Sequence, residues 1–363
     1  MIDSPARYDI AATNVPGVTV CFCRAVVNSF RPLQSRQEPA RSLMKALAAI
    51  LTLALAALAA ALWAYRDIPA ATLEARYAGP GSKFINIDGA RIHFRDEGSG
   101  PAIVLVHADF ASLIDWDPWA EALRDRYRVV RFDLAGHGLT GPDPSGDYSE
   151  ARTLALLGKL VDALGLRQFT LGGTAFGARL AIHYAATHPE RVQRLILLDP
   201  GPVHEAQPEQ AGEVPKAAWL LQYILPRALV VRVLESGFGD PARLTDAQVD
   251  RWHDLWMREG QREATLRRLA QQRPDDLEGA LRAIHAPVLL LWGEADAGVA
   301  GGQPREFLGL LPEAADTRLI VYPGVGRLAL EEAGAETGRD VRAWLDAGAK
   351  SAGGTITRPS PRP

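Results

Sequence analysis

The chain has 363 residues, of which 23% are charged, and a formal net charge of −3 at pH 7. This balance gives no electrostatic reason to expect nucleic-acid binding, and the length allows one large hydrophobic core or two modest ones. Both cysteines, Cys21 and Cys23, lie in the N-terminal tail, so neither a disulfide framework nor a cysteine-ligated zinc site is expected. We expect no metal and no cofactor.

A run of twenty residues without a charged side chain occupies residues 46–65, between Lys45 and Arg66. As a helix this run would be about 30 Å long, which matches the hydrocarbon core of a bilayer. Trp63 and Tyr65 stand at one end, where amphipathic rings favour the membrane interface. We therefore predict a transmembrane anchor, with a cleaved signal peptide and a buried core helix as the alternatives.

The residues before the anchor, 1–45, show no sustained periodicity and are predicted to be a disordered extension. Within them, Met44 competes with Met1 as the true start. The basic residues that precede the anchor favour a cytoplasmic N-terminus by the positive-inside rule. This orientation predicts a single-pass protein of the cell inner membrane with its main domain on the exported side. A secreted or soluble protein is the alternative.

After a predicted linker at residues 66–82, short apolar runs alternate with amphipathic stretches from residue 83 to residue 347. The runs are predicted strands at residues 84–87, 91–94, 103–106, 129–132, 169–171, 195–198, 288–291 and 319–321. Helices are predicted at residues 118–126, 150–164 and 176–187. This alternation predicts an α/β fold with a mostly parallel sheet and helices on both faces. The first two strands are expected to form an antiparallel hairpin at Asp88-Gly89.

The alternation is interrupted at residues 203–285, where helical patterns at 217–234, 245–259 and 262–271 follow one another. Aromatic residues recur on one side of these patterns, namely Trp219, Tyr223, Trp252 and Trp256. Each ring alone is typical of a helix that packs on a core. Together they indicate an inserted helical lid over the carboxyl ends of the strands, and we expect the four rings to line a pocket. Residues 348–363, rich in Gly, Ser, Thr and Pro, are predicted to be a disordered tail.

Residues 169–178 have the sequence FTLGGTAFGA, which predicts a strand, a sharp turn and the start of a helix. Gly173 and Gly177 are four residues apart and allow a tight turn that exposes the residue between them. This context is that of a nucleophile elbow, in which the central residue attacks the substrate. The central residue here is Ala175, which has no nucleophilic group.

Five motifs, in this order, resemble the α/β-hydrolase superfamily, in particular its lidded branch of esterases, epoxide hydrolases, dehalogenases and carbon–carbon hydrolases. The resemblance covers the chain from about residue 82 to residue 345. The motifs are His107-Ala108 after a strand, FDLAGHG at residues 132–138, the elbow, WGEAD at residues 292–296 and YPGVGR at residues 322–327. The resemblance implies the α/β-hydrolase fold and a hydrolase ancestry.

The family's mechanism requires a nucleophile at the elbow, an acid after a late strand and a histidine after the last strand. By resemblance, Asp296 occupies the acid position, but Ala175 and Arg327 occupy the other two. The last histidine of the chain is His285, so none follows at the matching place. Arginine stays protonated and cannot serve as the base.

The resemblance also implies that the backbone N–H groups of Asp109 and Phe176 form the oxyanion hole. An ionised Asp109 side chain would oppose a negative charge there by up to about 4 kcal/mol, at about 4 Å and an effective dielectric constant of about 20. Asp109, His107 and Thr174 are the candidates for a replacement base or nucleophile. Structural roles are the competing interpretation for all three.

Arg327 has two interpretations. A guanidinium can form an ion pair with Asp296, replacing the lost bond between acid and histidine. Alternatively, it holds an anionic ligand such as a carboxylate.

We therefore expect a membrane-anchored protein of hydrolase ancestry that lacks the usual triad hydrolysis, a pseudoenzyme, and retains a pocket for a small apolar or ester-like ligand. The alternatives are an active hydrolase or lyase that uses Asp109, His107 or Thr174, and a deliberately inactivated variant. The expected partners are this ligand and, through residues 46–65, the membrane. Neither a nucleic-acid partner nor a particular oligomeric state is predicted.

Overall fold

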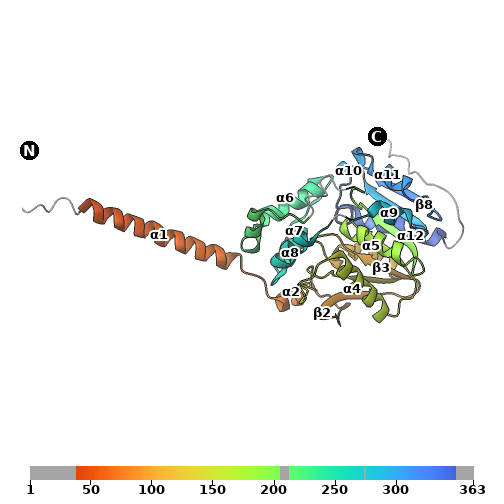
Figure 1. Ribbon diagram of the computed structural model, residues 1–363, viewed down its shortest axis with the longest axis horizontal. Coiled ribbons are helices and arrows are strands. Elements are labelled where there is room, and N and C mark those ends of the chain that lie inside the picture. Colours follow the sequence, from red (N-terminus) through yellow and green to blue (C-terminus); the bar gives the residue numbers. More distant parts are fainter. Residues whose placement is uncertain (1–37, 205–211, 274, 349–363) are drawn as a thin grey trace, which may run out of the picture. The chain divides into compact units, whose positions relative to one another are not determined.

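The computed structural model describes residues 38–204, 212–273 and 275–348 (Figure 1). It separates into two units at residue 60. The described part of the first unit lies within helix α1 (Glu38–Ala64), and the second unit contains the sheet.

Helix α1 has 27 residues, and its segment Ser42–Ala64 has a mean hydropathy of 2.3 with no buried part. It is long and apolar enough to span a membrane, although a signal sequence near the N-terminus has the same character. Because α1 begins at Glu38, residues 38–45 are helical and the predicted disorder is wrong for them. The rest of that prediction lies outside the described residues.

The sheet has eight strands in the order β1-β2-β4-β3-β5-β6-β7-β8. β1 and β2 pair antiparallel, β2 and β4 pair antiparallel, and all other neighbours are parallel. The strands are β1 (Ser82–Ile87), β2 (Ala90–Glu97), β3 (Ala102–Val106), β4 (Arg128–Phe132), β5 (Phe169–Thr174), β6 (Val192–Leu198), β7 (Val288–Gly293) and β8 (Thr317–Tyr322). This architecture confirms the predicted α/β fold.

The predicted hairpin forms between β1 and β2, where Asp88 and Gly89 both have positive φ, at 49° and 87°. Aspartate and glycine tolerate this left-handed region better than other residues do. The chain therefore enters the sheet antiparallel, as expected.

Helices cover both faces of the sheet, and successive side chains along a strand point to opposite faces. Along β3, Val104 and Val106 join one hydrophobic cluster, whereas Ile103 and Leu105 join the other. The first cluster packs against α4 (Glu150–Ala163), α5 (Phe176–Thr187), α9 (Leu277–Arg282) and α11 (Gln303–Gly309). The second packs against α3 (Asp117–Leu123) and α12 (Ala329–Gly348).

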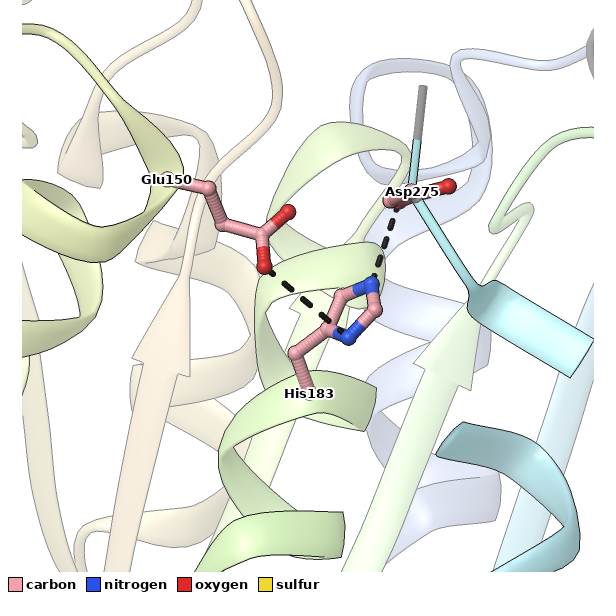
Figure 2. A group of neighbouring side chains, drawn as sticks. All are labelled: Glu150, His183 and Asp275. Carbon is pink, nitrogen blue, oxygen red and sulfur yellow. Dashed lines mark hydrogen bonds and ion pairs between the residues drawn. The ribbon is translucent and has the colours of Figure 1, made fainter. Parts of the chain in front are cut away.

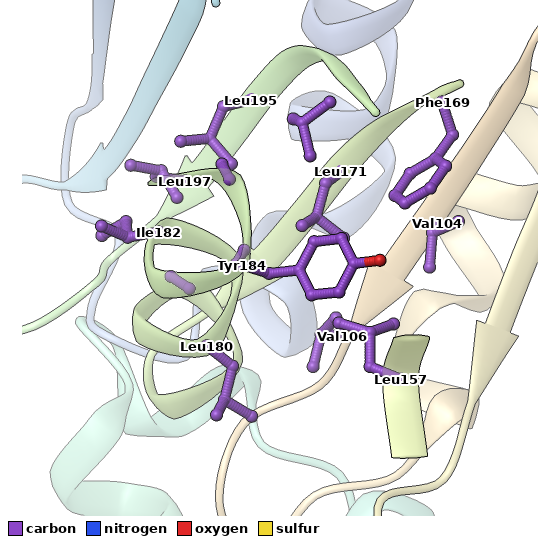
Figure 3. Packing of buried hydrophobic residues seen from close by; sticks show 14 of the residues in the cluster. Val104, Val106, Leu157, Phe169, Leu171, Leu180, Ile182, Tyr184, Leu195 and Leu197 are labelled. Carbon is purple, nitrogen blue, oxygen red and sulfur yellow. The ribbon is translucent and has the colours of Figure 1, made fainter. Parts of the chain in front are cut away.

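The first cluster fixes α5, the helix that follows the elbow. Figure 3 shows Tyr184 of α5 among side chains of β3, β5 and α4. Its ring lies 6.2 Å from that of Phe169 in β5, centroid to centroid. Both residues are almost completely buried, so α5 is held rigidly against the strand that leads into it.

Part of the predicted linker is folded, and that prediction is wrong for it. Helix α2 (Ala70–Tyr77) buries Leu73 completely. The Ile68 N–H donates to the Met257 carbonyl at 2.7 Å, and the Tyr77 hydroxyl donates to Asp254 at 2.7 Å. A short helix with one large apolar residue on its buried face gives too little periodicity to detect in the sequence.

Between β6 and β7 lie only helices among the described residues. They are η3 (Lys216–Gln222), α6 (Arg227–Gly237), η4 (Pro241–Arg243), α7 (Asp246–Trp256), α8 (Gln261–Gln271) and α9. The single helix predicted at 217–234 is wrong: η3 and α6 meet at a bend of 114°. Pro226 precedes α6 and has no N–H to continue a helix. Together, η3 and α6 are long and apolar enough for one membrane span that is broken at the bend.

The remaining described helices are η1 (Leu113–Trp116) and α10 (Ala297–Ala300). The predicted C-terminal tail begins at Gly348, the last residue of α12, and otherwise lies outside the described residues.

Candidate functional site

The elbow keeps its geometry without a nucleophile. Ala175 stands between β5 and α5 with φ 46° and ψ −117°, a strained conformation for a residue with a side chain. A Cβ on Gly173 would lie 2.2 Å from the Gly177 carbonyl oxygen, and one on Gly177 would lie 2.2 Å from that of Val106. Only glycine fits at either position, so the tight turn is built into the packing of β3, β5 and α5.

A cleft of about 1170 Å³ opens at the elbow. Its walls come from the start of α4, the exposed side of α5, the loop after β6, the end of α8 and α9. Ala175, Phe176, Asp199, Arg268 and Arg327 all line it. The volume is sufficient for a small organic molecule.

Asp296, at the acid position, forms an ion pair with Arg327, which stands where the family has its histidine. Asp296 is the N-cap of α10 and accepts a hydrogen bond from the Gly298 N–H at 3.1 Å. The Arg327 guanidinium lies 3.4 and 3.5 Å from its two carboxylate oxygens. The Asp296 side chain is 1% exposed and that of Arg327 is 52% exposed. The hypothesised ion pair is therefore present but long, and its arginine reaches solvent.

Asp109 is bound by a buried arginine. The Arg268 Nη1 donates to Asp109 Oδ1 at 2.6 Å, and His137 Nε2 lies 3.8 Å from the same oxygen. The guanidinium offsets the charge that an ionised Asp109 would bring to the oxyanion hole. The backbone N–H groups of Asp109 and Phe176 donate to no acceptor within the described part of the chain.

His107 uses both ring nitrogens in holding loops. Its Nδ1 donates to the Ala108 carbonyl at 2.7 Å, and its Nε2 accepts from the Leu134 N–H at 2.9 Å. Burial lowers the pKa of His107, which keeps the ring neutral. This arrangement leaves no ring nitrogen to accept a substrate proton. His137, in the FDLAGHG turn, is likewise buried, and burial lowers its pKa strongly.

The remaining predicted site residues are not part of the cleft wall. Thr174 is buried and does not line the cleft, and neither do Trp219, Tyr223, Trp252 and Trp256. Tyr223 is 54% exposed. The two α7 tryptophans pack in a separate apolar cluster that Ala175 adjoins.

Asp199, which the sequence analysis did not select, lies beside the elbow. It follows β6, is completely buried and has φ 42°. Its Oδ1 accepts from the Gly293 N–H at 2.9 Å, while its Oδ2 has no partner among the described residues. Burial raises its pKa well above the usual range of a carboxyl group. The only sequence signal for a role of Asp199 in the site is its place directly after β6, the strand that pairs with β5.

Arg268 was also missed. Its side chain is 4% exposed, and its Nε and Nη2 have no hydrogen-bond partner in the described part of the chain. The guanidinium carbon lies 5.3 Å from the ring centroid of Phe110 and 5.9 Å from that of Phe176. In the sequence it looks like one more basic residue on an amphipathic helix.

A second polar group lies along the same cleft, where Glu150, His183 and Asp275 come together from α4, α5 and the segment before α9 (Figure 2). His183 Nε2 lies 3.1 Å from Asp275 and Nδ1 lies 3.9 Å from Glu150. Burial alone would lower the pKa of His183, but the hydrogen bond to Asp275 and the two carboxylate charges outweigh it and raise the pKa.

The three ligand atoms of this group lie within 4.8 Å of one another, close enough to consider a metal ion. However, the carboxylates face opposite nitrogens of the ring, and Arg179 also binds Asp275. One ion cannot meet both sides of the imidazole, so the arrangement fits an imidazolium between two carboxylates better than a metal site.

Comparison with known proteins identifies the family. A family profile described as "alpha/beta hydrolase fold" matches residues 101–232. A 2-hydroxymuconate semialdehyde hydrolase of Pseudomonas putida is 30% identical over 216 residues, which are 57% of this chain and 75% of that protein. This chain belongs to the α/β-hydrolase fold family.

Two further similarities fit this assignment. A cis-3-alkyl-4-alkyloxetan-2-one decarboxylase of Shewanella oneidensis is 30% identical over 152 residues, which are 41% of this chain. The match spans about half of that protein, 47%. The crystal structure of an enol-lactonase of Burkholderia xenovorans has a TM-score of 0.63 at 22% identity, covering 73% of this chain and 100% of that one. At this identity the likeness is one of fold.

Within this α/β-hydrolase fold, the cleft offers oriented donors but no complete triad. Among the described residues, His183 is the only histidine that lines the cleft. It stands eight residues beyond Ala175 along α5, about 12 Å by the rise of a helix. That separation is too large for His183 to activate a group at the elbow, since general-base catalysis requires hydrogen-bond reach.

Proposed function

We propose that this α/β-hydrolase fold protein is a non-hydrolytic, membrane-anchored binding protein, whose cleft holds a small apolar or ester-like molecule. The observation that carries the proposal is the elbow itself. Ala175 occupies the nucleophile position in the strained turn, and Arg327 occupies the histidine position against Asp296. The cleft remains, and so do backbone N–H groups beside it that have no acceptor among the described residues.

The magnitude of the loss supports a binding role. In a serine protease, loss of the nucleophile or of the base lowers turnover by about 10⁶-fold, and loss of both costs little more. Binding and the oxyanion hole alone leave roughly 10³–10⁴-fold over water. Ester hydrolysis by the family's route is therefore expected to be close to background.

An active hydrolase or lyase with rewired residues has less support. Arg268 engages Asp109, backbone groups engage both nitrogens of His107, and Thr174 does not line the cleft. Each of these groups would have to leave its present partner or position to act on a substrate.

The test is turnover of short-chain aryl esters and epoxides by the full chain in detergent micelles. The native chain is expected to match empty micelles. The double variant Ala175→Ser with Arg327→His is expected to hydrolyse esters above that level, and Ala175→Ser alone, which lacks a base, is the matched control. Native turnover well above empty micelles that is lost in Asp109→Asn would refute the proposal and favour the rewired enzyme.

We further propose that α1 anchors the protein in the inner membrane, with the cytoplasm on the N-terminal side and the α/β-hydrolase domain exported. The apolar segment Ser42–Ala64 and the basic residues before it support this arrangement. The helices between β6 and β7 would act as the lid of the cleft, since α8 and α9 contribute to its wall.

A further inference from the structure

Two buried polar side chains reach the elbow end of the cleft without a complete set of partners. Within the described residues, Asp199 Oδ2 has no hydrogen-bond partner, and neither do Nε and Nη2 of Arg268. Asp199 is completely buried, and the Arg268 side chain is 4% exposed. Buried polar groups are satisfied in nearly all native structures, and each exception requires an explanation. Both of these residues line the same cleft.

Both groups lie close to Ala175. Leu198 pairs with Thr174 across the β5–β6 ladder and accepts the Ala175 N–H at 3.0 Å, so Asp199 follows directly beside the elbow. The guanidinium carbon of Arg268, in α8, lies 5.9 Å from the ring centroid of Phe176, the residue after Ala175. We call Ala175, Phe176, Asp199, Arg268 and Arg327 the elbow pocket.

The elbow pocket presents mainly hydrogen-bond donors. Burial raises the pKa of Asp199 well above its usual range, against the opposing effects of the Gly293 N–H and Arg327, and the charge of Asp296 raises it further. This shift favours the neutral carboxyl group, whose hydroxyl can donate a hydrogen bond. Arg268 and Arg327 line the cleft, whereas the carboxylates that pair with them, on Asp109 and Asp296, do not. A ligand in the pocket therefore meets the guanidinium groups and not their counter-charges.

We propose that the elbow pocket binds the carboxylate of a small organic acid, with the Asp199 carboxyl group and the Arg268 guanidinium as its donors. Hydrogen bonds from these groups to an ionised oxygen are stronger than bonds to a neutral one. A carboxylate has two oxygens that accept hydrogen bonds, one for each of these donors. The proposal rests on the proposed function, a cleft that binds a small molecule, and replaces the ester-like group of that ligand by a carboxylate.

The test is calorimetric titration of the full chain in detergent micelles with phenylacetate and hexanoate. Methyl phenylacetate and phenylacetamide serve as neutral analogues of the same size. We expect saturable binding of at least one acid at one site. The neutral analogues of phenylacetate are expected to bind about 10-fold more weakly than the acid, as the loss of charge-assisted hydrogen bonds predicts.

Single substitutions test which residues bind the carboxylate. Asp199→Asn keeps an acceptor for the Gly293 N–H and supplies an amide donor, so it should bind the acid within about threefold of the native chain. Asp199→Leu and Arg268→Lys remove bonds to the ligand and should each weaken binding about 10-fold. Arg267→Lys is the matched control for Arg268→Lys. It changes the adjacent arginine of α8, which binds Glu263 on the surface and does not line the cleft, and it should leave the affinity unchanged.

Several results would overturn the carboxylate site. They are an absence of saturable binding by both acids, equal binding of phenylacetate and its methyl ester, and native affinity in both Asp199→Leu and Arg268→Lys. Melting curves of the variants separate a lost ligand contact from a lost fold, and Asp199→Asn still reports if Asp199→Leu does not fold. None of these outcomes bears on turnover, so the non-hydrolytic function stands or falls by the separate hydrolysis assay.

Discussion

At the scale of single residues, the elbow shows that its geometry does not depend on a nucleophile. Ala175 keeps a positive φ because Gly173 and Gly177 let β5 and α5 approach too closely for any other turn. The strain is stored in the backbone and costs of order 1–3 kcal/mol. An alanine therefore removes the chemistry and leaves the strain.

This strain predicts that Ala175→Gly increases the free energy of unfolding by up to about 1 kcal/mol, because glycine tolerates positive φ. Ala155→Gly, at an exposed position in the middle of α4, is the matched control and should lower it by about 0.5–1 kcal/mol. Chemical denaturation of the full chain measures both. Equal losses in the two variants would contradict a strained elbow.

Asp199 predicts a dependence of stability on pH. Its pKa in the folded chain is raised above the ordinary value of 3.8, so the folded state retains a proton that the unfolded state releases. The stability that this proton contributes is complete below the ordinary pKa and is lost as pH rises toward the folded pKa. Asp199→Asn cannot release a proton, and its unfolding free energy relative to the native chain should therefore grow from pH 4 to pH 8. A difference that stays constant over this range would argue against a protonated Asp199.

At the scale of elements, strong local signals were easier to predict than tertiary contacts. Strand runs such as residues 103–106 and the helix 176–187 were placed closely. The helix predicted at 217–234 ignored Pro226, and α2 was missed because most of its surface is exposed. Periodicity detects elements with a wide buried face, and α2 has a narrow one.

The folded state of α2 predicts that Leu73→Ala lowers the free energy of unfolding by about 2–5 kcal/mol, the usual cost of removing a fully buried leucine. Leu220→Ala provides the control, since Leu220 is 64% exposed and should change stability by about 0.5 kcal/mol or less. A value for Leu73→Ala as small as that of the control would mean that the segment is a linker after all.

At the scale of the whole molecule, the order of the motifs along the chain located the elbow and the acid position. It also located the arginine that occupies the position of the family's histidine. It missed Asp199 and Arg268, which enter the cleft from β6 and α8 and become neighbours only in the folded chain. A strand-end aspartate and a helical arginine carry no local pattern that marks them. The aromatic stripe on the predicted lid helices indicated four pocket residues, none of which lines the cleft.

The proposed anchor makes a further prediction at this scale. The full chain should remain with the membrane after alkaline carbonate extraction and keep its own N-terminal sequence. Leu55→Arg should release part of it, because an arginine near the centre of a span costs about 2.5–3.5 kcal/mol. An N-terminus found beyond residue 64 would instead identify a cleaved signal peptide.

The cleft is proposed to hold a small molecule without converting it, and a single-turnover measurement tests the absence of conversion. Methyl phenylacetate is incubated with the native full chain in molar excess, and ester and phenylacetate are quantified by chromatography, so that even a single slow turnover is visible. We expect the ester to disappear no faster than in empty micelles. Phenylacetate formed at a rate that increases with protein concentration would contradict it.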